Sequence, residues 1–392
     1  MDKFVISPIP ELIFGVNTIE SLPKIIVDST YKDITVITGG DSFITSIFWQ
    51  NLSASLNLAG INFYHFKSTG ETTPETVDGI IHELKDKKID AVIAIGGGTV
   101  LDTGKAVSAL LCMEGSIVDY LEGVGSTEPT GERKPLICVP TTSGTGSEAT
   151  KNAVITKVGK DGYKKSLRHT AYIPDTVIID PELIKSCPLE LTISTGMDAI
   201  TQLLESYVST KASLFTDTLA LMGLKLAGQS LPKLVENIED MDARSDMAYA
   251  AYLSGITLAN AGLGVVHGAA SVLGSMRPIP HGVVCGTLLG AAAESIIGKL
   301  NEKKNPGSIK SLIKFSEAGD ALTGSKNNTV EDSCNNLINT LNTWVDTYKI
   351  PKLSDYKFTE SDLILSSKLI GIKNTPCPLD SENILSMLME RL

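Results

Sequence analysis

Strand-like and helix-like segments alternate through the first half of the chain. The run at residues 33–40 is short, rich in β-forming residues and ends in glycines. The run at 90–98 is continuously apolar, which is typical of a strand buried on both faces. Between them, residues 72–89 place apolar side chains at helical spacing, and further strands are predicted at 135–142 and 176–183. This alternation predicts a parallel sheet covered by helices.

The pattern changes near Cys187 and Pro188, and only helical periodicity follows it. We therefore expect an α/β domain with a parallel sheet at residues 1–185 and an all-α domain at residues 186–392. The length of 392 residues also favours two domains over one.

The charge pattern disfavours two classes of partner. The net charge is −11 and there is no block of Lys or Arg, so we expect neither a nucleic-acid nor a membrane partner. No signal peptide is visible, and the longest mostly apolar stretch, 282–297, is too short to span a bilayer and contains Glu294. The six scattered cysteines form no CxxC pair, which predicts reduced thiols and a cytoplasmic protein.

Two loops that follow predicted strands are rich in small and hydroxyl-bearing residues. Glycines 96–98 open a helix, so their N–H groups can bind an anion, although a tight strand–helix turn has the same pattern. Residues 139–148 combine two glycines with five hydroxyl side chains. Two such loops at strand ends of one α/β domain favour a crevice for a dinucleotide.

Two of the five histidines lie in the helical half, and each taken singly is typical of a core residue. Asp198 lies between apolar positions of a predicted helix, so its carboxylate needs a cation or hydrogen bonds. Together with His267 and His281 it forms a ligand set suited to Zn²⁺ or Fe²⁺.

The chain resembles the iron-containing, or group III, alcohol dehydrogenase family in segments spread over nearly its whole length. The resemblance implies an N-terminal dinucleotide-binding domain, a C-terminal metal- and substrate-binding helical domain, and an active site in the cleft between them. The segments, in order, are PELIFGVNTIESL, in which Asn17 replaces a glycine, IGGGTVLDTGK, PTTSGTGSE, IPDTVIIDPEL, TGMDAITQLLESY, GLGVVHG, IPHGVVCG and IKNTPCPLDSENI.

The resemblance also implies which residues form the site. His267 and Ser271 are the expected catalytic residues. The expected metal ligands are Asp198, Gln202, His267 and His281. The expected cofactor-binding residues are Gly39, Gly40, Ser42, Gly97, Gly98, Thr99, Asp102, Thr141, Thr142 and Lys164.

Two positions depart from the family pattern. Gln202 stands where members usually have a further histidine ligand, four residues after the ligand aspartate. Its carbonyl oxygen could bind the metal, its amide could hold a metal-bound water, or it could only hydrogen-bond Asp198. Ser271 stands where members often have a second histidine, so the proton relay is Ser271, solvent or a ribose hydroxyl.

The turn after the strand TVIT, residues 35–38, predicts NADP(H), with NAD(H) as the alternative. Members that use NAD generally place an Asp where this chain has Gly39, and that Asp would repel a 2′-phosphate. Gly40 and Ser42 complete a turn that resembles that of NADPH-dependent aldehyde reductases in the family, whereas Asp41 is an acid close to the same place.

We therefore expect an NAD(P)-dependent alcohol dehydrogenase or aldehyde reductase that contains one divalent metal, Fe²⁺ or Zn²⁺. The reaction would transfer a hydride between nicotinamide and a small aldehyde or primary alcohol. A metal-independent reductase of the maleylacetate type and an inactive dinucleotide-binding protein are the alternatives. The family commonly forms dimers or larger assemblies, so a homo-oligomer is expected.

Overall fold

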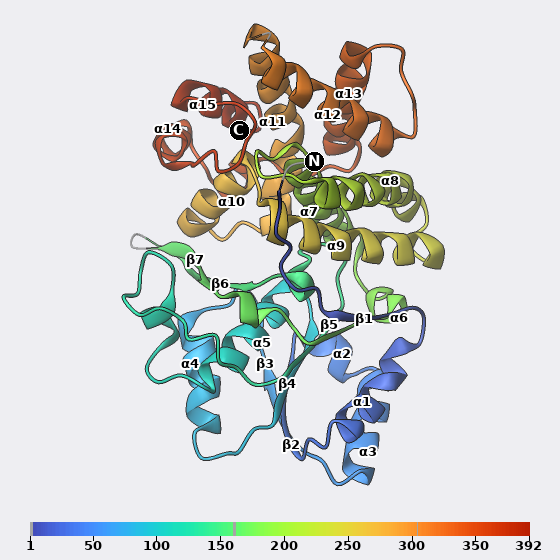
Figure 1. Ribbon diagram of the computed structural model, residues 1–392, viewed down its shortest axis with the longest axis vertical. Coiled ribbons are helices and arrows are strands. Elements are labelled where there is room, and N and C mark those ends of the chain that lie inside the picture. Colours follow the sequence, from blue (N-terminus) through green and yellow to red (C-terminus); the bar gives the residue numbers. More distant parts are fainter. Residues whose placement is uncertain (1–2, 160–161, 304) are drawn as a thin grey trace. The chain divides into compact units, whose positions relative to one another are not determined.

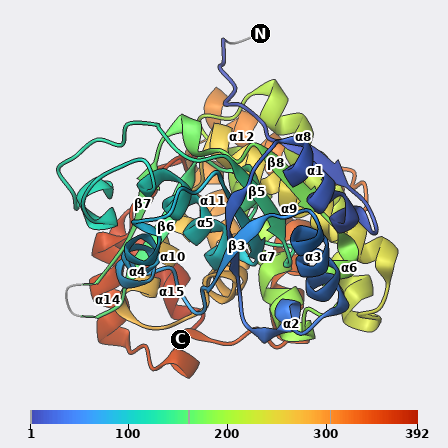
Figure 2. The ribbon, with the colours of Figure 1, turned by 90° about the horizontal axis from the view of Figure 1, so that it is seen from below.

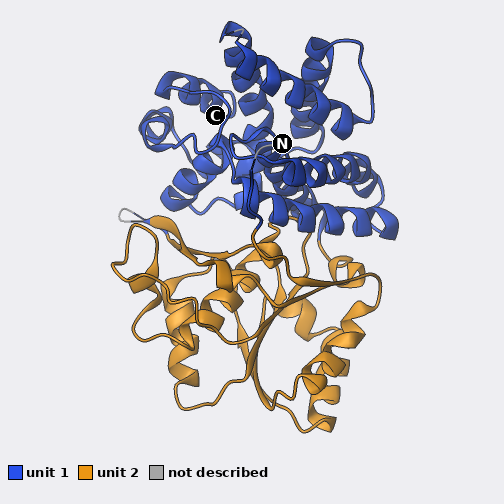
Figure 3. Cartoon of the chain, viewed as in Figure 1, with its two compact units in different colours: residues 1–6, 158–162, 188–392 blue, residues 7–157, 163–187 orange. Residues whose placement is uncertain are grey.

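The computed structural model describes residues 3–159, 162–303 and 305–392. The chain forms two compact units (Figure 3). Residues 7–157 and 163–187 form the sheet unit, and residues 188–392 make up most of the helical unit.

The sheet unit is built on a six-stranded sheet in which every pair of neighbours is parallel. The predicted parallel sheet is therefore confirmed, and four strands lie within the predicted runs. The two strands at the sheet edges were not predicted, because partly exposed strands lack a continuous apolar run. The spatial order is β1 (Glu11–Phe14), β8 (Thr176–Ile179), β5 (Leu136–Pro140), β4 (Ala91–Gly96), β2 (Asp33–Thr38) and β3 (Asn62–Lys67).

Helices cover both faces of this sheet (Figure 1, Figure 2). Ile93 and Ile95 of β4 point into a core shared with α1 and α3. Ala94 points to the other face, where α5 packs so closely that a Cβ on Gly104 would lie 2.6 Å from the Ala94 Cβ. The helices of this unit are α1 (Leu22–Asp28), α2 (Asp41–Ile44), α3 (Ile47–Leu58), α4 (Pro74–Leu84), α5 (Gly98–Leu110) and α6 (Pro181–Ile184); an antiparallel hairpin of β6 (Asn152–Lys157) and β7 (Tyr163–Arg168) packs near α5.

The helical unit has one large hydrophobic core and, among its described residues, no strand. α11 packs against most of the other helices. It is longer than the apolar stretch predicted at 282–297 and is long and apolar enough to cross a membrane, but most of it is buried in this core. The helices are α7 (Leu189–Val208), α8 (Leu214–Glu236), α9 (Met241–Ala261), α10 (Val265–Met276), α11 (His281–Lys303), α12 (Pro306–Thr323), α13 (Val330–Thr347), α14 (Glu360–Leu369) and α15 (Ser381–Met389).

The turn after β1 is held by the carboxylate that follows β8, its parallel neighbour. Asn17 adopts the left-handed backbone conformation, with φ of 64°. Its N–H donates to Asp180 Oδ1 at 3.1 Å, and the N–H of Ile19 donates to Asp180 Oδ2 at 3.1 Å. The turn therefore needs a residue that tolerates positive φ, as Asn does.

Replacing Asn17 should affect stability through backbone conformation, because its side chain is exposed. Asn17→Val should destabilise the sheet unit by about 1–2 kcal/mol, and Asn17→Gly should be neutral or stabilising. Thermal unfolding followed by circular dichroism measures the difference, with exposed Val16→Ala as the neighbouring control. Equal midpoints for Asn17→Val and the wild type would show that the left-handed turn is not required.

Candidate active site

Three loops rich in glycine, Ser or Thr follow neighbouring strands of the parallel sheet. Gly39 and Gly40 follow β2, Gly97 and Gly98 follow β4, and residues 141–147 follow β5. Because β2, β4 and β5 are adjacent and parallel, these loops lie along one edge of the sheet. The strand order reverses at β2 and β4, since β3 lies beyond β2 and β5 lies beyond β4. Open α/β sheets bind ligands at such a point.

The N-terminus of α5 has the features of an anion site. Gly97 is its N-cap, and no described side chain caps the helix there. A Cβ on Gly98 would lie 2.6 Å from Thr145, and a Cβ on Gly97 would lie 3.4 Å from Thr142, so the two loops pack directly on each other. The glycines thus leave backbone N–H groups for a phosphate, whereas the Thr99 hydroxyl donates to the carbonyl of Gly70 at 2.7 Å.

Other predicted cofactor residues have partners within the sheet unit. Asp102 accepts hydrogen bonds from the Ser147 hydroxyl at 2.5 Å and from the N–H of Val154 at 2.9 Å, which ties α5 to the loop and to the hairpin. Lys164 in β7 forms an ion pair with Glu71 at 2.9 Å. Thr141 and Thr142 begin the loop after β5, and Ser42 lies in α2.

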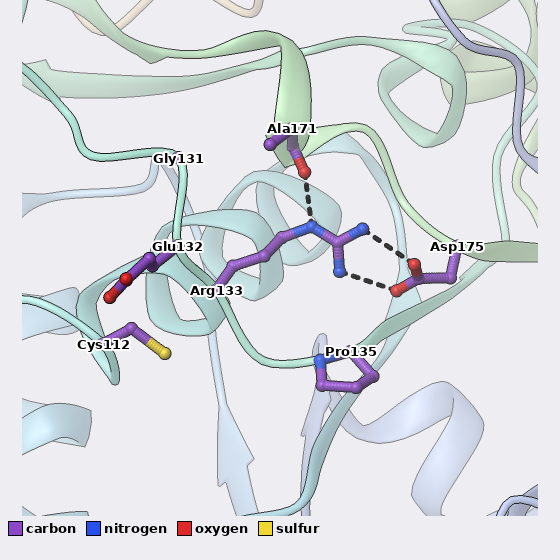
Figure 4. Close-up of a pocket in the computed structure, with 7 residues that line it drawn as sticks. All are labelled: Cys112, Gly131, Glu132, Arg133, Pro135, Ala171 and Asp175. Atoms are coloured by element: carbon purple, nitrogen blue, oxygen red, sulfur yellow. Dashed lines mark hydrogen bonds and ion pairs between the residues drawn. The ribbon is translucent and has the colours of Figure 1, made fainter.

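The pocket in Figure 4 lies at the opposite edge of the sheet from these loops, because its residues Pro135 and Asp175 directly precede β5 and β8. Arg133 crosses it and donates to the carbonyl of Ala171 at 2.5 Å and to both carboxylate oxygens of Asp175 at 2.6 and 2.8 Å. The Arg133 guanidinium is thus occupied by hydrogen bonds within the protein, and these bonds connect the segments that precede β5 and β8. This pocket therefore has no part in the candidate site.

The helical unit brings Asp198, His267 and His281 together from α7, α10 and α11. The Nε2 atoms of His267 and His281 lie 3.4 and 3.7 Å from Asp198 Oδ1. α11 can approach α7 this closely because residue 282 is a glycine. A Cβ on Gly282 would lie 2.4 Å from the Ser194 carbonyl oxygen, so any other residue would collide with α7.

Asp198 and His267 have the electrostatics of a cation site. Asp198 Oδ1 is buried and makes no hydrogen bond within the part of the chain that the structure describes. Burial raises the pKa of Asp198, but His281 and His267 outweigh this effect and hold the pKa below its usual value. Burial lowers the pKa of His267, yet its interactions with Cys285, Asp198 and Glu205 raise the pKa well above its usual range. A divalent cation among these groups fits both the donor atoms and the charge.

Glu205 is a member of this site that the sequence reasoning missed. It is buried, and its Oε2 lies 2.7 Å from His267 Nδ1, while its Oε1 accepts from the N–H of Val266 at 2.7 Å. A carboxylate on Nδ1 leaves Nε2 for a metal and fixes the orientation of the ring. The signal was present in the sequence, because Asp198 and Glu205 are seven residues apart and share one helical face.

Cys285 is the second missed member. Its buried Sγ lies 3.8 Å from His267 Nε2 and 3.7 Å from His281 Nε2. Cys285 follows His281 by four residues in α11, a spacing that places both on one helical face. Burial raises the pKa of the Cys285 thiol to about 12.

The two residues at which the chain departs from the family pattern both have partners. Gln202 is buried one turn after Asp198, and its Oε1 accepts from the hydroxyl of Ser254 at 2.6 Å. The hydroxyl of Ser271 donates to the carbonyl of His267 at 3.0 Å, one turn before it in α10. Their predicted roles at the metal and in proton transfer stay predictions.

Both halves of the chain match sequence models of one protein family. The iron-containing alcohol dehydrogenase model matches residues 10–181, and the model of the C-terminal domain of Fe-containing alcohol dehydrogenases matches residues 192–391.

Individual proteins show the same similarity. The chain is 34% identical to an NAD-dependent methanol dehydrogenase of Bacillus methanolicus over 70% of this chain and 71% of that protein. The structure of an alcohol dehydrogenase from Oenococcus oeni matches all of both chains with a TM-score of 0.86 and 27% identity. That of a 1,3-propanediol oxidoreductase, at 24% identity, matches all of both chains with a TM-score of 0.88 and shares the fold.

Glu205→Gln should weaken divalent metal binding by about 10–100-fold, because an amide is a poorer acceptor for the imidazole N–H and fixes the ring less firmly. Competition with a chromophoric chelator measures the dissociation constant. Glu190→Gln, an exposed change in the same helix, is the control. Unchanged affinity in Glu205→Gln would limit Glu205 to holding the N-terminus of α10.

Proposed function

The chain belongs to the iron-containing alcohol dehydrogenase family, and we propose that it is a metal-dependent enzyme that interconverts small aldehydes and primary alcohols with NADP(H). Its similarity to named alcohol dehydrogenases supports alcohol–aldehyde interconversion. The observation that carries the metal dependence is the buried Asp198 Oδ1, which has no hydrogen bond among described residues and faces two imidazole nitrogens.

Asp198, His267 and His281 would hold a divalent ion, Zn²⁺ or Fe²⁺. The bound ion supplies a Lewis acid for the substrate oxygen. The reduced nicotinamide supplies the hydride. Glu205 keeps Nε2 of His267 directed at the ligand atoms, and the burial of Asp198 and His267 excludes water from one side of the site.

We assign the proton relay to Ser271, with solvent or a ribose hydroxyl as the alternative. Its hydroxyl donates to the His267 carbonyl and keeps lone pairs that can accept a second hydrogen bond. A serine does not change charge near neutral pH, so it would pass a proton on rather than store one.

The preference for NADP(H) is supported by the charges beside the turn after β2. Gly39 itself carries no acidic side chain, and a Cβ built on it would meet the side chain of Val100 at 3.5 Å. Asp41, the acid close by, forms an ion pair with Lys67 at 2.6 Å, and this contact lowers the pKa of Asp41. Lys67 ends β3 beside Thr38 of β2, so a cation lies near the place proposed for a 2′-phosphate.

We further propose a homodimer, as is common in the family, that functions in the cytoplasm. The structure assigns no disulfide to the six cysteines, all of which lie in its described part, and this supports a reducing compartment.

Removing metal ligands should abolish turnover without preventing dinucleotide binding, because the two sets of residues lie in different units. Asp198→Asn and His281→Ala should each release the metal, and the double variant should be little worse than either single one. Metal analysis, NADPH binding by fluorescence and turnover of an aldehyde panel measure this, with exposed Asp242→Asn as the control. Full turnover of the chelated wild type would instead favour a metal-independent reductase.

The wild type should use NADPH more efficiently than NADH. Gly39→Asp should move the preference toward NADH by at least about tenfold, the effect of 1.4 kcal/mol, because the new carboxylate repels the 2′-phosphate. Gly39→Asn has the same shape without the charge and should move it less. The ratio of kcat/KM for the two cofactors measures the preference, and equal or NADH-favouring efficiency in the wild type would contradict NADP(H) specificity.

A further inference from the structure

We propose that Cys285 is the fourth protein ligand of the metal, which it would bind as a thiolate beside Asp198, His267 and His281. This inference rests on the metal-dependent function proposed above. It names a ligand set of one sulfur, two nitrogens and one oxygen, and it predicts a site that selects Zn²⁺ over harder ions such as Mg²⁺ and Mn²⁺.

The N–S and N–O distances between the proposed ligand atoms fit a tetrahedral site. With Zn–S of about 2.3 Å and Zn–N and Zn–O of about 2.1 Å, tetrahedral angles separate N from S by about 3.6 Å and N from O by about 3.4 Å. Cys285 Sγ lies 3.7 and 3.8 Å from the two Nε2 atoms, and Asp198 Oδ1 lies 3.4 and 3.7 Å from them. All four atoms lie within 4.8 Å of one another.

The backbone of α11 places Cys285 for this role. His281 and Cys285 are one turn apart, and the glycine that follows each of them faces α7. A Cβ on Gly286 would lie 2.9 Å from the Cβ of Met197, and a Cβ on Gly282 would lie 2.4 Å from the Ser194 carbonyl oxygen. The absence of side chains at Gly282 and Gly286 thus brings both donor atoms to the carboxylate of Asp198.

Asp198 is an independent sign that a ligand belongs there. Its side chain is almost completely buried, and Oδ1 has no hydrogen bond among the described residues, although it lies beside the two imidazoles. Leaving a buried carboxylate oxygen without a hydrogen bond is costly. A cation that binds Oδ1, both Nε2 atoms and Sγ removes this cost.

Gln202 is the other candidate for the fourth metal ligand, but its side-chain oxygen already accepts a hydrogen bond. The Ser254 hydroxyl donates to its Oε1, the atom that would bind a metal, and so joins α7 to α9. A neutral amide is also a weaker ligand than a thiolate for a borderline-soft ion. Metal binding converts the thiol to a thiolate and releases its proton to solvent, with no change of oxidation state.

Cobalt substitution tests the sulfur ligand directly. The wild-type enzyme loaded with Co²⁺ should show a thiolate-to-cobalt charge-transfer band in the near ultraviolet. Cys285→Ser should lose that band and bind Zn²⁺ about 10–100-fold more weakly. Cys334→Ser, which removes another buried thiol of the helical unit, and Gln202→Leu should keep the band.

The possible outcomes separate the two proposals. If the wild type binds Co²⁺, loses it in Asp198→Asn, and shows no charge-transfer band, Cys285 is not a ligand while the metal-dependent function stands. If the wild type binds neither Co²⁺ nor Zn²⁺, both proposals are wrong.

A measurement on unmodified protein covers the case in which Cys285→Ser does not fold. X-ray absorption of the Zn²⁺-loaded wild type should show one sulfur at about 2.3 Å. A first shell of nitrogen and oxygen alone would overturn the inference.

Discussion

The close packing of α11 on α7 is the constraint on which the helical unit depends. Gly282 and Gly286 meet the backbone and the Cβ of α7 where any side chain would collide. This contact sets the distance between the two helices that carry the proposed ligands Asp198 and His281, and densely packed protein interiors are sensitive to a change of even one methylene group. Side chains at these glycines would therefore move the imidazole of His281 away from Asp198 as well as disturb the core.

Around this contact, the site is organised by the balance of charge. Asp198, Glu205 and Cys285 supply negative or potentially negative groups in a buried place, and two imidazoles lie among them. Without a metal, such a place attracts protons, which is why the pKa of His267 is raised. The same field attracts a divalent cation, which competes with those protons for the same nitrogen atoms.

The sequence was most informative where a residue's own chemistry or its periodicity determines its position. Buried strands such as β4 can be predicted from their continuous apolar runs. Asp198 can be identified as a candidate ligand because it is a charged residue among apolar helix neighbours. Edge strands β1 and β3, which are partly exposed, lack that signal. Glu205 and Cys285 were missed because their importance lies in contacts with a histidine on another helix, and helical periodicity alone does not reveal which helices meet.

The proposed metal ligands and the proposed cofactor-binding turns lie in different units, and this separation has a thermodynamic consequence. Every proposed metal ligand belongs to the helical unit, whereas the glycine turns belong to the sheet unit. By linkage, a metal at a hundred times its dissociation constant would stabilise the unit that binds it by about 2.7 kcal/mol, and a dinucleotide bound by the glycine turns would do the same for the other unit. In a metal-starved cell the helical unit would open more often and be degraded first. The abundance of the enzyme would then follow the metal supply even when nicotinamide cofactor is plentiful.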